Sequence, residues 1–378
     1  MSKFQGSYVR DVEDCLIASA LAGVHAILSG PPGCGKTAIS RAVASKIAPG
    51  NETVFIRLDA STPPERVKGI YDMELLLTQT KFQTITAGTV YDQVARIVIL
   101  DEFGRPSDPV FDTLIDGLDR QDVSYDDAPV IWGTTNFLPT SERTQALIDR
   151  VAMYLHIPKV KVDIKDVVTA QMQALGGDLT VNGNLPTWKE IAEVRKARPN
   201  AKTIEAVADA LYTLATEAAK GVRDNDGNVL ASYEINHRRL AQWQKIVYRC
   251  AVYYGGNADF TTIPAAAMRP LQWAWPTMNE TEARNWQAVC NAVVDPVATA
   301  LDAVKKAAYQ KFESIAKMGD QQKMALELGK ALSDSMAGLN VLDQSGTDAR
   351  IPEAILDLKR VFGRIVAGEN PFKEGDDG

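Results

Sequence analysis

The chain has 378 residues, of which 46% are hydrophobic and 24% are charged, and its formal net charge is −7 at pH 7. This length exceeds what one compact core supports, so we expect two or three domains. The acidic balance disfavours a strong nucleic-acid-binding surface, and no apolar run is long enough for a membrane span.

Cysteine usage and the N-terminal residues both indicate a reducing compartment. The four cysteines are widely spaced and form no metal-ligand pair, so we expect free thiols in the cytoplasm. The first six residues lack the apolar core of a signal peptide. The cysteines are Cys15, Cys34, Cys250 and Cys290.

A phosphate-binding motif follows the first predicted strand, residues 24–28, and precedes a helical run over residues 38–44. It matches G-x-x-x-x-G-K-[ST], in which glycines turn the backbone and the helix start presents N–H groups to an anion. We expect Lys36 to contact the outer phosphates of a nucleotide and Thr37 to hold Mg²⁺. The alternative, a Gly-rich turn that binds nothing, fits this context less well. The predicted nucleotide contacts are Gly30, Pro31, Pro32, Gly33, Cys34, Gly35, Lys36, Thr37 and Ala38.

Two acidic residues follow the third predicted strand. Residues 53–58 and 96–100 are apolar runs typical of strands buried on both faces of a parallel sheet. Ligands of such sheets bind at the carboxyl ends of the strands, which brings Asp101 and Glu102 beside the phosphate loop. We expect Asp101 to hold Mg²⁺, usually through water, and Glu102 to polarise an attacking water. The alternative is a solvated acidic strand end.

Two further polar residues lie near later strands. Residues 130–136 predict a strand whose last residue, Asn136, could bond the γ-phosphate or the attacking water, although Asn at a strand end is often only a turn residue. Arg150 precedes the predicted strand 151–157. It could stabilise transition-state charge on phosphate as an arginine finger, or form a surface ion pair, and spacing alone leaves both open.

Taken together, these elements resemble the AAA+ ATPases, and finer detail resembles the MoxR family and its RavA-like branch. Many families share the phosphate loop, whereas the Asp-Glu-x-x-Arg and Asp-Arg elements with a late Arg-Arg pair are more specific. The resemblance covers roughly residues 8–285. The matching stretches are residues 30–37, 87–90, 99–105, 133–136, 147–150 and 234–240.

This resemblance implies a ring, usually of six subunits, that binds ATP and Mg²⁺ between neighbours. Arg150 would be the finger that reaches into the adjacent subunit's site, and Asn136 would be the first sensor. Arg238 would be the second sensor, with Arg239 the less favoured choice. Arg105 would lie near the subunit interface.

Some stretches extend the family pattern or depart from it. Residues 61–86 resemble the family's insertion in helix 2, and their stretch 75–84 could form a hairpin facing the pore or an ordinary edge hairpin. Gly104 stands where the family commonly has Asn, and Phe137 stands where it commonly has Pro. Residues 121–129, the expected hairpin before the first sensor, are short for an element that handles substrate.

The predicted fold class is α/β, with three domains. An AAA+ parallel sheet with helices on both faces is expected over residues 1–158, an all-α lid over 159–290 and a helical C-terminal extension over 291–378. Apolar residues three and four apart predict the lid helices. Four tryptophans are expected to form the lid core, rather than a platform for stacked bases. They are Trp243, Trp273, Trp275 and Trp286.

The C-terminal extension carries amphipathic stripes over residues 297–315 and 328–336. We expect this helical pair to pack on its own lid or on a neighbouring subunit, with recruitment of a partner protein as the alternative. The acidic, Gly-rich end, residues 373–378, is expected to be disordered.

The sequence thus indicates Mg²⁺-dependent ATP hydrolysis, by direct attack of water, in a homo-oligomeric ring that remodels or matures a protein partner as a chaperone would. Members of the MoxR family often work beside proteins with von Willebrand factor A domains, which suggests the class of partner. One alternative is a AAA+ nucleic-acid motor or loader, which the acidic balance disfavours. Another is a nucleotide-gated scaffold with little turnover, which the intact Lys36, Asp101, Glu102 and Arg150 disfavour.

Overall fold

The chain forms two compact units, residues 1–290 and 291–378, and each is described here by itself. The structure is a computed structural model. None of the helices it describes combines the length and apolar character that crossing a bilayer requires. The described residues are 7–79, 83–118, 128–137, 146–157, 185–223, 229–256, 258–277, 279–317, 321–342 and 350–367.

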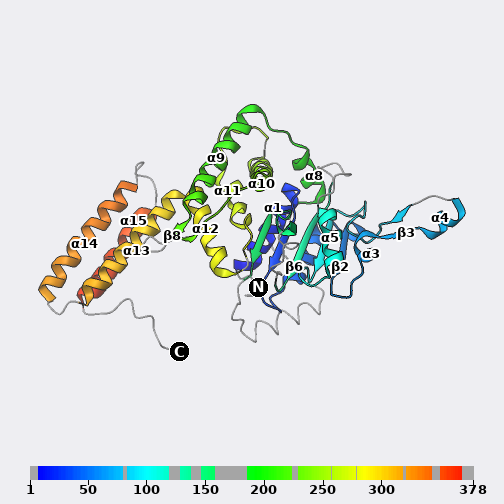
Figure 1. Cartoon of the computed structure of the whole chain (residues 1–378). Coiled ribbons are helices and arrows are strands. Elements are labelled where there is room, and N and C mark those ends of the chain that lie inside the picture. The colour runs from blue at the N-terminus through cyan, green and yellow to red at the C-terminus, as the bar shows by residue number, and fades with distance from the viewer. Residues whose placement is uncertain are drawn as a thin grey trace. The chain divides into compact units, whose positions relative to one another are not determined.

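A parallel five-stranded sheet forms the centre of the first unit (Figure 1). Its strand order is β2-β5-β6-β1-β7, so the strand that precedes the phosphate loop lies between two later strands. The register pairs Asp101 with Thr134 and Ser29 with Thr135, which brings three strand ends to one edge of the sheet. The strands are β1 (Ala26–Ser29), β2 (Thr53–Arg57), β5 (Ile97–Asp101), β6 (Val130–Thr135) and β7 (Met153–His156).

Helices cover both faces of this sheet. On one face, Ile27, Val98 and Ile131 share a buried cluster with Leu114 of α5 (Asp108–Leu118). The neighbouring residue in β6, Trp132, points to the opposite face, where its indole N–H donates to Ser19 Oγ at 3.1 Å. That face is covered by α1 (Ser7–Ala22) and α2 (Lys36–Ile47). Strands buried on both sides explain the continuous apolar runs, and the predicted α/β fold with helices on both faces is confirmed.

The insertion after β2 differs from the expected hairpin. After α3 (Pro64–Lys68), the short strands β3 (Ile70–Tyr71) and β4 (Thr84–Ile85) pair antiparallel and flank the helix α4 (Met73–Gln79). The start of the stretch predicted as a hairpin, residues 75–79, is therefore helical, because Asp72 caps the segment by accepting from the Leu75 N–H at 3.0 Å and leucines favour helix. Figure 1 shows this insertion projecting from the sheet.

Helices make up most of the first unit after residue 184, as predicted. Side chains cap the starts of several of them: Thr187 and Glu190 form a capping box at α8, Asn200 accepts from the Thr203 N–H at α9, and Asn236 accepts from the Arg239 N–H at α10. A short antiparallel pair, β8 (Val222–Arg223) and β9 (Val229–Ala231), adds a small sheet to this predicted all-α region. The helices are α8 (Trp188–Lys196), α9 (Ala201–Lys220), α10 (His237–Gly255), α11 (Ala265–Met268) and α12 (Glu280–Val294), and the 3₁₀ helices of the unit are η1 (Gly50–Glu52) and η2 (Arg269–Trp273).

Aromatic side chains form the core of this helical region. Trp243 and Trp286 are fully buried and lie 5.4 Å apart by ring centroids, and Trp275 lies 5.3 Å from Trp286. Each of the two buried indoles donates its N–H to a backbone carbonyl, of Ala274 and Leu271 respectively. Buried rings with satisfied polar atoms indicate a structural core, as predicted for these tryptophans.

The second unit consists of three helices in its described part, α13 (Pro296–Ala316), α14 (Gln321–Leu342) and α15 (Arg350–Val366). The stripe predicted on the first helix is buried inside this unit, with Phe312 fully buried among residues of the other two helices, including Leu328 and Leu358. The stripes predict a pair of helices, and α15 is an addition to that pair, although its apolar residues also recur at helical spacing. The segments 119–127, 158–184 and 368–378 lie outside the described residues. They include most of the short hairpin predicted over residues 121–129 and the acidic tail predicted over residues 373–378.

Candidate nucleotide-binding site

Glycines set the path of the loop between β1 and α2. The helix α2 begins at Lys36, directly after Gly35, whose φ of 82° lies in the left-handed region that glycine adopts without strain. At Gly30, a Cβ atom would lie 2.6 Å from the carbonyl oxygen of Ile157. Only glycine therefore lets the loop pass so close to the residue that follows β7.

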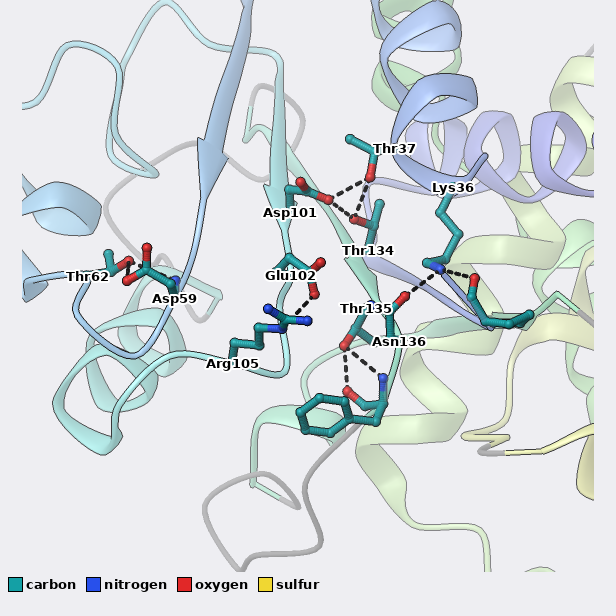
Figure 2. Close-up of polar contacts among 12 residues, drawn as sticks. Lys36, Thr37, Asp59, Thr62, Asp101, Glu102, Arg105, Thr134, Thr135 and Asn136 are labelled. Atoms are coloured by element: carbon teal, nitrogen blue, oxygen red, sulfur yellow. Dashed lines mark hydrogen bonds and ion pairs between the residues drawn. The ribbon is translucent and has the colours of Figure 1, made fainter. Parts of the chain in front are cut away.

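The Lys36 ammonium group connects this loop to the end of β6. The side chain is 7% exposed, and Nζ donates to the carbonyl oxygens of Gly30 and Pro31, both at 2.8 Å. It also donates to Asn136 Oδ1 at 3.0 Å. Figure 2 shows the contact of Lys36 with Asn136, so the two residues predicted to contact the outer phosphates lie within hydrogen-bonding distance.

Three oxygen-bearing side chains form a closed group beside the loop. Thr37 Oγ1 and Thr134 Oγ1 both donate to Asp101 Oδ1, each at 2.6 Å, and the two hydroxyl oxygens lie 3.3 Å apart (Figure 2). The groups come from α2, β5 and β6. Mg²⁺ prefers oxygen ligands of this kind and takes only one or two from protein, with phosphate and water supplying the rest. Thr37 and Asp101 therefore fit the predicted Mg²⁺ ligands, and no cluster of three or more His, Cys, Asp or Glu suited to a metal occurs among the described residues.

Glu102 has a backbone conformation that residues other than glycine seldom adopt. Its φ is 59°, and it is the only described residue other than glycine with a positive φ. The Arg105 N–H closes the turn by donating to the Glu102 carbonyl oxygen at 2.9 Å. The Arg105 Nε lies 3.0 Å from Glu102 Oε2 (Figure 2), but that oxygen accepts no aligned hydrogen bond from the described residues. A carboxylate held in this way by charge alone retains lone pairs for a water molecule.

The turn after β6 brings Gly104 and Phe137 close together. Thr135 Oγ1 contacts both the Phe137 carbonyl oxygen, at 2.5 Å, and the Phe137 N–H, at 3.3 Å, and so closes a turn around Asn136. This turn lies against Gly104, where a Cβ atom would be 2.2 Å from the Phe137 carbonyl oxygen. Position 104 therefore suits glycine, because any larger residue would push the Asn136 turn away, and proline at position 137 would lack the N–H that contacts Thr135 Oγ1.

A cavity of about 330 Å³ lies where these groups meet. It combines a cationic ammonium and two carboxylates at the carboxyl ends of β1, β5 and β6, where ligands of parallel sheets bind. This arrangement can hold a phosphate chain, a divalent cation and a water molecule together. The lining residues are Pro32, Gly33, Gly35, Lys36, Thr37, Ala38, Asp101, Glu102, Thr134, Thr135 and Asn136.

The predicted arginines are not among the described residues that line this cavity. Arg150 is partly exposed, and its Nη1 donates to the Ala146 carbonyl oxygen at 2.8 Å. Arg239 is 5% exposed, and its Nη1 donates to the Val151 carbonyl oxygen at 3.2 Å. Arg238, one position earlier on α10, is exposed. Of the neighbouring pair, only Arg238 is therefore available to a ligand in this structure.

Two residues in or beside the site have no role predicted from the sequence. They are Thr134, whose hydroxyl holds Asp101, and His156, whose Nδ1 lies 3.1 Å from Ser29 Oγ directly before the phosphate loop. Burial lowers the pKa of His156 below its ordinary value of 6.5. That His156 and Ser29 are neighbours follows only from the strand order, since β7 pairs with β1 across more than a hundred residues.

Comparison with known proteins agrees with this geometry. Residues 25–148 match the family described as AAA domain (dynein-related subfamily). The chain therefore contains an AAA domain, and the match covers the phosphate loop, Asp101, Glu102 and Asn136.

Individual relatives are more distant. The uncharacterized protein MJ0812 of Methanocaldococcus jannaschii is 26% identical over 198 residues, which are 45% of this chain and 52% of that protein, so the chain spans about half the length of the curated relative it matches. A crystal structure of a "putative ATPase" from Cytophaga hutchinsonii aligns with a TM-score of 0.50 at 14% identity, over 76% of this chain and 92% of that one. This likeness shows the fold alone. A full-length MCM homolog from Methanopyrus kandleri aligns at a TM-score of 0.41 and 13% identity, over 74% of this chain and 54% of that one.

Proposed function

We propose that this protein is a Mg²⁺-dependent ATPase of the MoxR type, close to the RavA-like branch, that acts as a homo-oligomeric ring on a protein partner. The observation that carries the proposal is the convergence of five side chains on one cavity at the carboxyl ends of three parallel strands. They are Lys36, Thr37, Asp101, Glu102 and Asn136.

Each of these side chains has a task in hydrolysis. Lys36 binds the outer phosphates, and Asn136, which it contacts at 3.0 Å, orients the γ-phosphate or the attacking water. Thr37 and Asp101 would hold Mg²⁺, which neutralises phosphate charge when bound. Glu102 accepts a hydrogen bond from the water and takes its proton as the water attacks.

The finger is assigned to Arg150, acting on the ATP of a neighbouring subunit. Its guanidinium group bonds to its own Ala146 carbonyl, and Arg150 is absent from the described lining of its own cavity, which supports action in trans. Arg238 is assigned as the second sensor because it is exposed where Arg239 is buried. A ring, usually of six subunits, gives each Arg150 a neighbour to act on.

A chaperone-like role on a protein partner comes from the resemblance, and a partner with a von Willebrand factor A domain is the first to test. The projecting insertion supports a protein partner, because Tyr71, Met73 and Leu77 on it are more than half exposed. The cytoplasmic location and the division of the first unit at residue 158 stay predictions.

The test combines phosphate release with mass measurement of single particles in Mg²⁺ plus ATP, in ADP and without nucleotide. Glu102→Gln should lower turnover about 10²–10⁴-fold while ATP binding persists. A nucleotide-dependent ring with turnover is the expected result. Unchanged turnover in Glu102→Gln would remove the assigned base, and tight ATP binding without turnover in the wild type would favour a scaffold. Stimulation by DNA or RNA that weakens with salt would favour a nucleic-acid motor or loader.

A further inference from the structure

Buried apolar residues flank Arg150 in the turn that carries it. Leu147, Ile148 and Val151 are each at most 3% exposed, and backbone hydrogen bonds close the turn from the Arg150 N–H to the Leu147 carbonyl and from the Val151 N–H to the Ile148 carbonyl. The carbonyl groups that point away from the turn need other donors, since a buried carbonyl without one is costly.

Three buried side chains donate to four consecutive carbonyls, of which only that of Ile148 also accepts from within the turn. Gln242 Nε2 donates to the carbonyl oxygens of Asp149, at 3.4 Å, and Arg150, at 3.2 Å. Arg239 Nη1 donates to the Val151 carbonyl oxygen at 3.2 Å. The Tyr154 hydroxyl donates to the Ile148 carbonyl oxygen and also contacts the Val151 carbonyl oxygen at 3.2 Å.

The donors themselves are fixed in place. Tyr154, Arg239 and Gln242 are 2%, 5% and 9% exposed. The Arg239 guanidinium group lies over the rings of Trp275 and Tyr154, with centroids at 5.6 and 5.9 Å, and so is held between the aromatic core and β7. Side chains with so little freedom can fix the backbone they bond.

Two of these donors lie on α10, the helix that also carries exposed Arg238 near its start. A movement of α10 therefore displaces the carbonyls of residues 149–151, and with them the origin of the Arg150 side chain. The contact spans two segments about 90 residues apart in the chain, as the separation of 93 between Gln242 and Asp149 shows.

We propose that Gln242, Arg239 and Tyr154 are positioning residues that clamp the Arg150 turn to α10, so that the helix sensing ATP in one subunit sets the finger acting on the next. This inference rests on the proposed function of Arg150. The clamp residues do not contact ATP in this proposal. Loss of the clamp should therefore impair the ATP site of the neighbouring subunit and leave the subunit's own site intact.

The experiment compares Gln242→Ala with Gln244→Ala in the full chain. Gln244 is the same residue type on the same helix two positions later, and it is exposed. Gln242→Ala should lower turnover at least about 10-fold, because small misplacements of a catalytic group are costly, while ATP affinity changes less than about twofold. Gln244→Ala should behave as wild type. Tyr154→Phe removes one hydroxyl, keeps the ring and provides a second, milder variant that should show the same split between turnover and affinity.

Subunit mixing separates this role from a general loss of stability. Rings of Gln242→Ala and Lys36→Ala subunits should recover turnover, because the first supplies an intact cavity and the second an intact finger. Arg150→Ala mixed with Lys36→Ala is the reference. If the reference recovers turnover but the Gln242→Ala mixture does not, or if Gln242→Ala and Tyr154→Phe are fully active, the clamp is refuted while the finger stands. If Arg150→Ala is itself fully active, the finger assignment fails and the clamp fails with it.

Discussion

Thr37 Oγ1 donates to Asp101 Oδ1 at 2.6 Å, although 64 residues separate them in the chain. The contact joins the first turn of α2 to the end of β5 and places the two predicted Mg²⁺ ligands side by side. Since the Thr134 hydroxyl holds the same oxygen at 2.6 Å, the carboxylate is oriented from two sides. Such partners orient and tune the ligands of a metal ion.

Replacing Thr37 by Val should remove the hydroxyl and keep the shape of the side chain. We expect turnover to fall at least about 10-fold and the Mg²⁺ concentration for half-maximal activity to rise, as happens when groups around a metal are lost. Thr37→Ser keeps the hydroxyl and is the matched control. Titration of phosphate release with Mg²⁺ measures both effects, and a Thr37→Val protein with unaltered Mg²⁺ dependence would exclude Thr37 as a ligand.

Substitutions at the neighbouring residues Arg238 and Arg239 should have different effects. The first should alter the response to ATP and the second the free energy of unfolding. Arg239→Ala removes a buried charged donor to the Val151 carbonyl oxygen, so we expect a loss of about 1.5–3 kcal/mol in the free energy of unfolding. Arg238→Ala, at an exposed position, should change stability by less than about 0.5 kcal/mol but lower the response to ATP. Chemical unfolding followed within residues 1–290, together with ATP titration, measures both. Equal destabilisation by the two variants would contradict this assignment.

Replacing Gly104 by alanine should destabilise the turn around Asn136. In Gly104→Ala the new Cβ would lie 2.2 Å from the Phe137 carbonyl oxygen and 2.8 Å from Thr135 Oγ1, so the turn must move. We expect a loss of about 1–3 kcal/mol in stability, the usual cost of overpacking, and lower turnover because Asn136 moves with the turn. Gly255→Ala is the control, because nothing lies within 4 Å of its Cβ position. A Gly104→Ala protein as stable and active as that control would show that the turn can move without loss of stability or activity.

Local patterns in the sequence predict the parts of the site that one segment carries. The phosphate loop follows from its glycines and Lys36-Thr37, and the five strands follow from short apolar runs that end in polar residues. The rule that ligands bind at strand ends then brings Asp101, Glu102 and Asn136 to the loop, and all three line the same cavity.

The remaining features depend on register between distant segments. Thr134 faces Asp101 only because β5 and β6 pair in one particular register, and Gly104 meets Phe137 for the same reason. The sequence predicts a hairpin where α4 forms, because the short apolar run of this segment fits either structure. No spacing rule relates Gln242 to Asp149, so the contact between α10 and the Arg150 turn could be found only in three dimensions.

His156 should make the stability of the first unit depend on pH. Burial lowers its pKa below 6.5; Lys36 lowers it further, while Glu280 and Glu282 oppose the shift. As pH falls through 6.5, the unfolded chain takes up a proton that the folded protein takes up only at lower pH. The unfolded state then binds more protons, and the free energy of unfolding falls as the pH falls.

His156→Asn removes this proton-binding group and keeps a polar side chain near Ser29. We expect chemical unfolding between pH 7 and pH 5 to show a smaller loss of stability in His156→Asn than in the wild type. Ser29→Ala is the control: it removes the hydroxyl 3.1 Å from Nδ1 and leaves the imidazole buried, so its pH dependence should match the wild type. If His156→Asn and wild type lose stability in parallel, His156 is protonated alike in both states, and burial does not govern its titration.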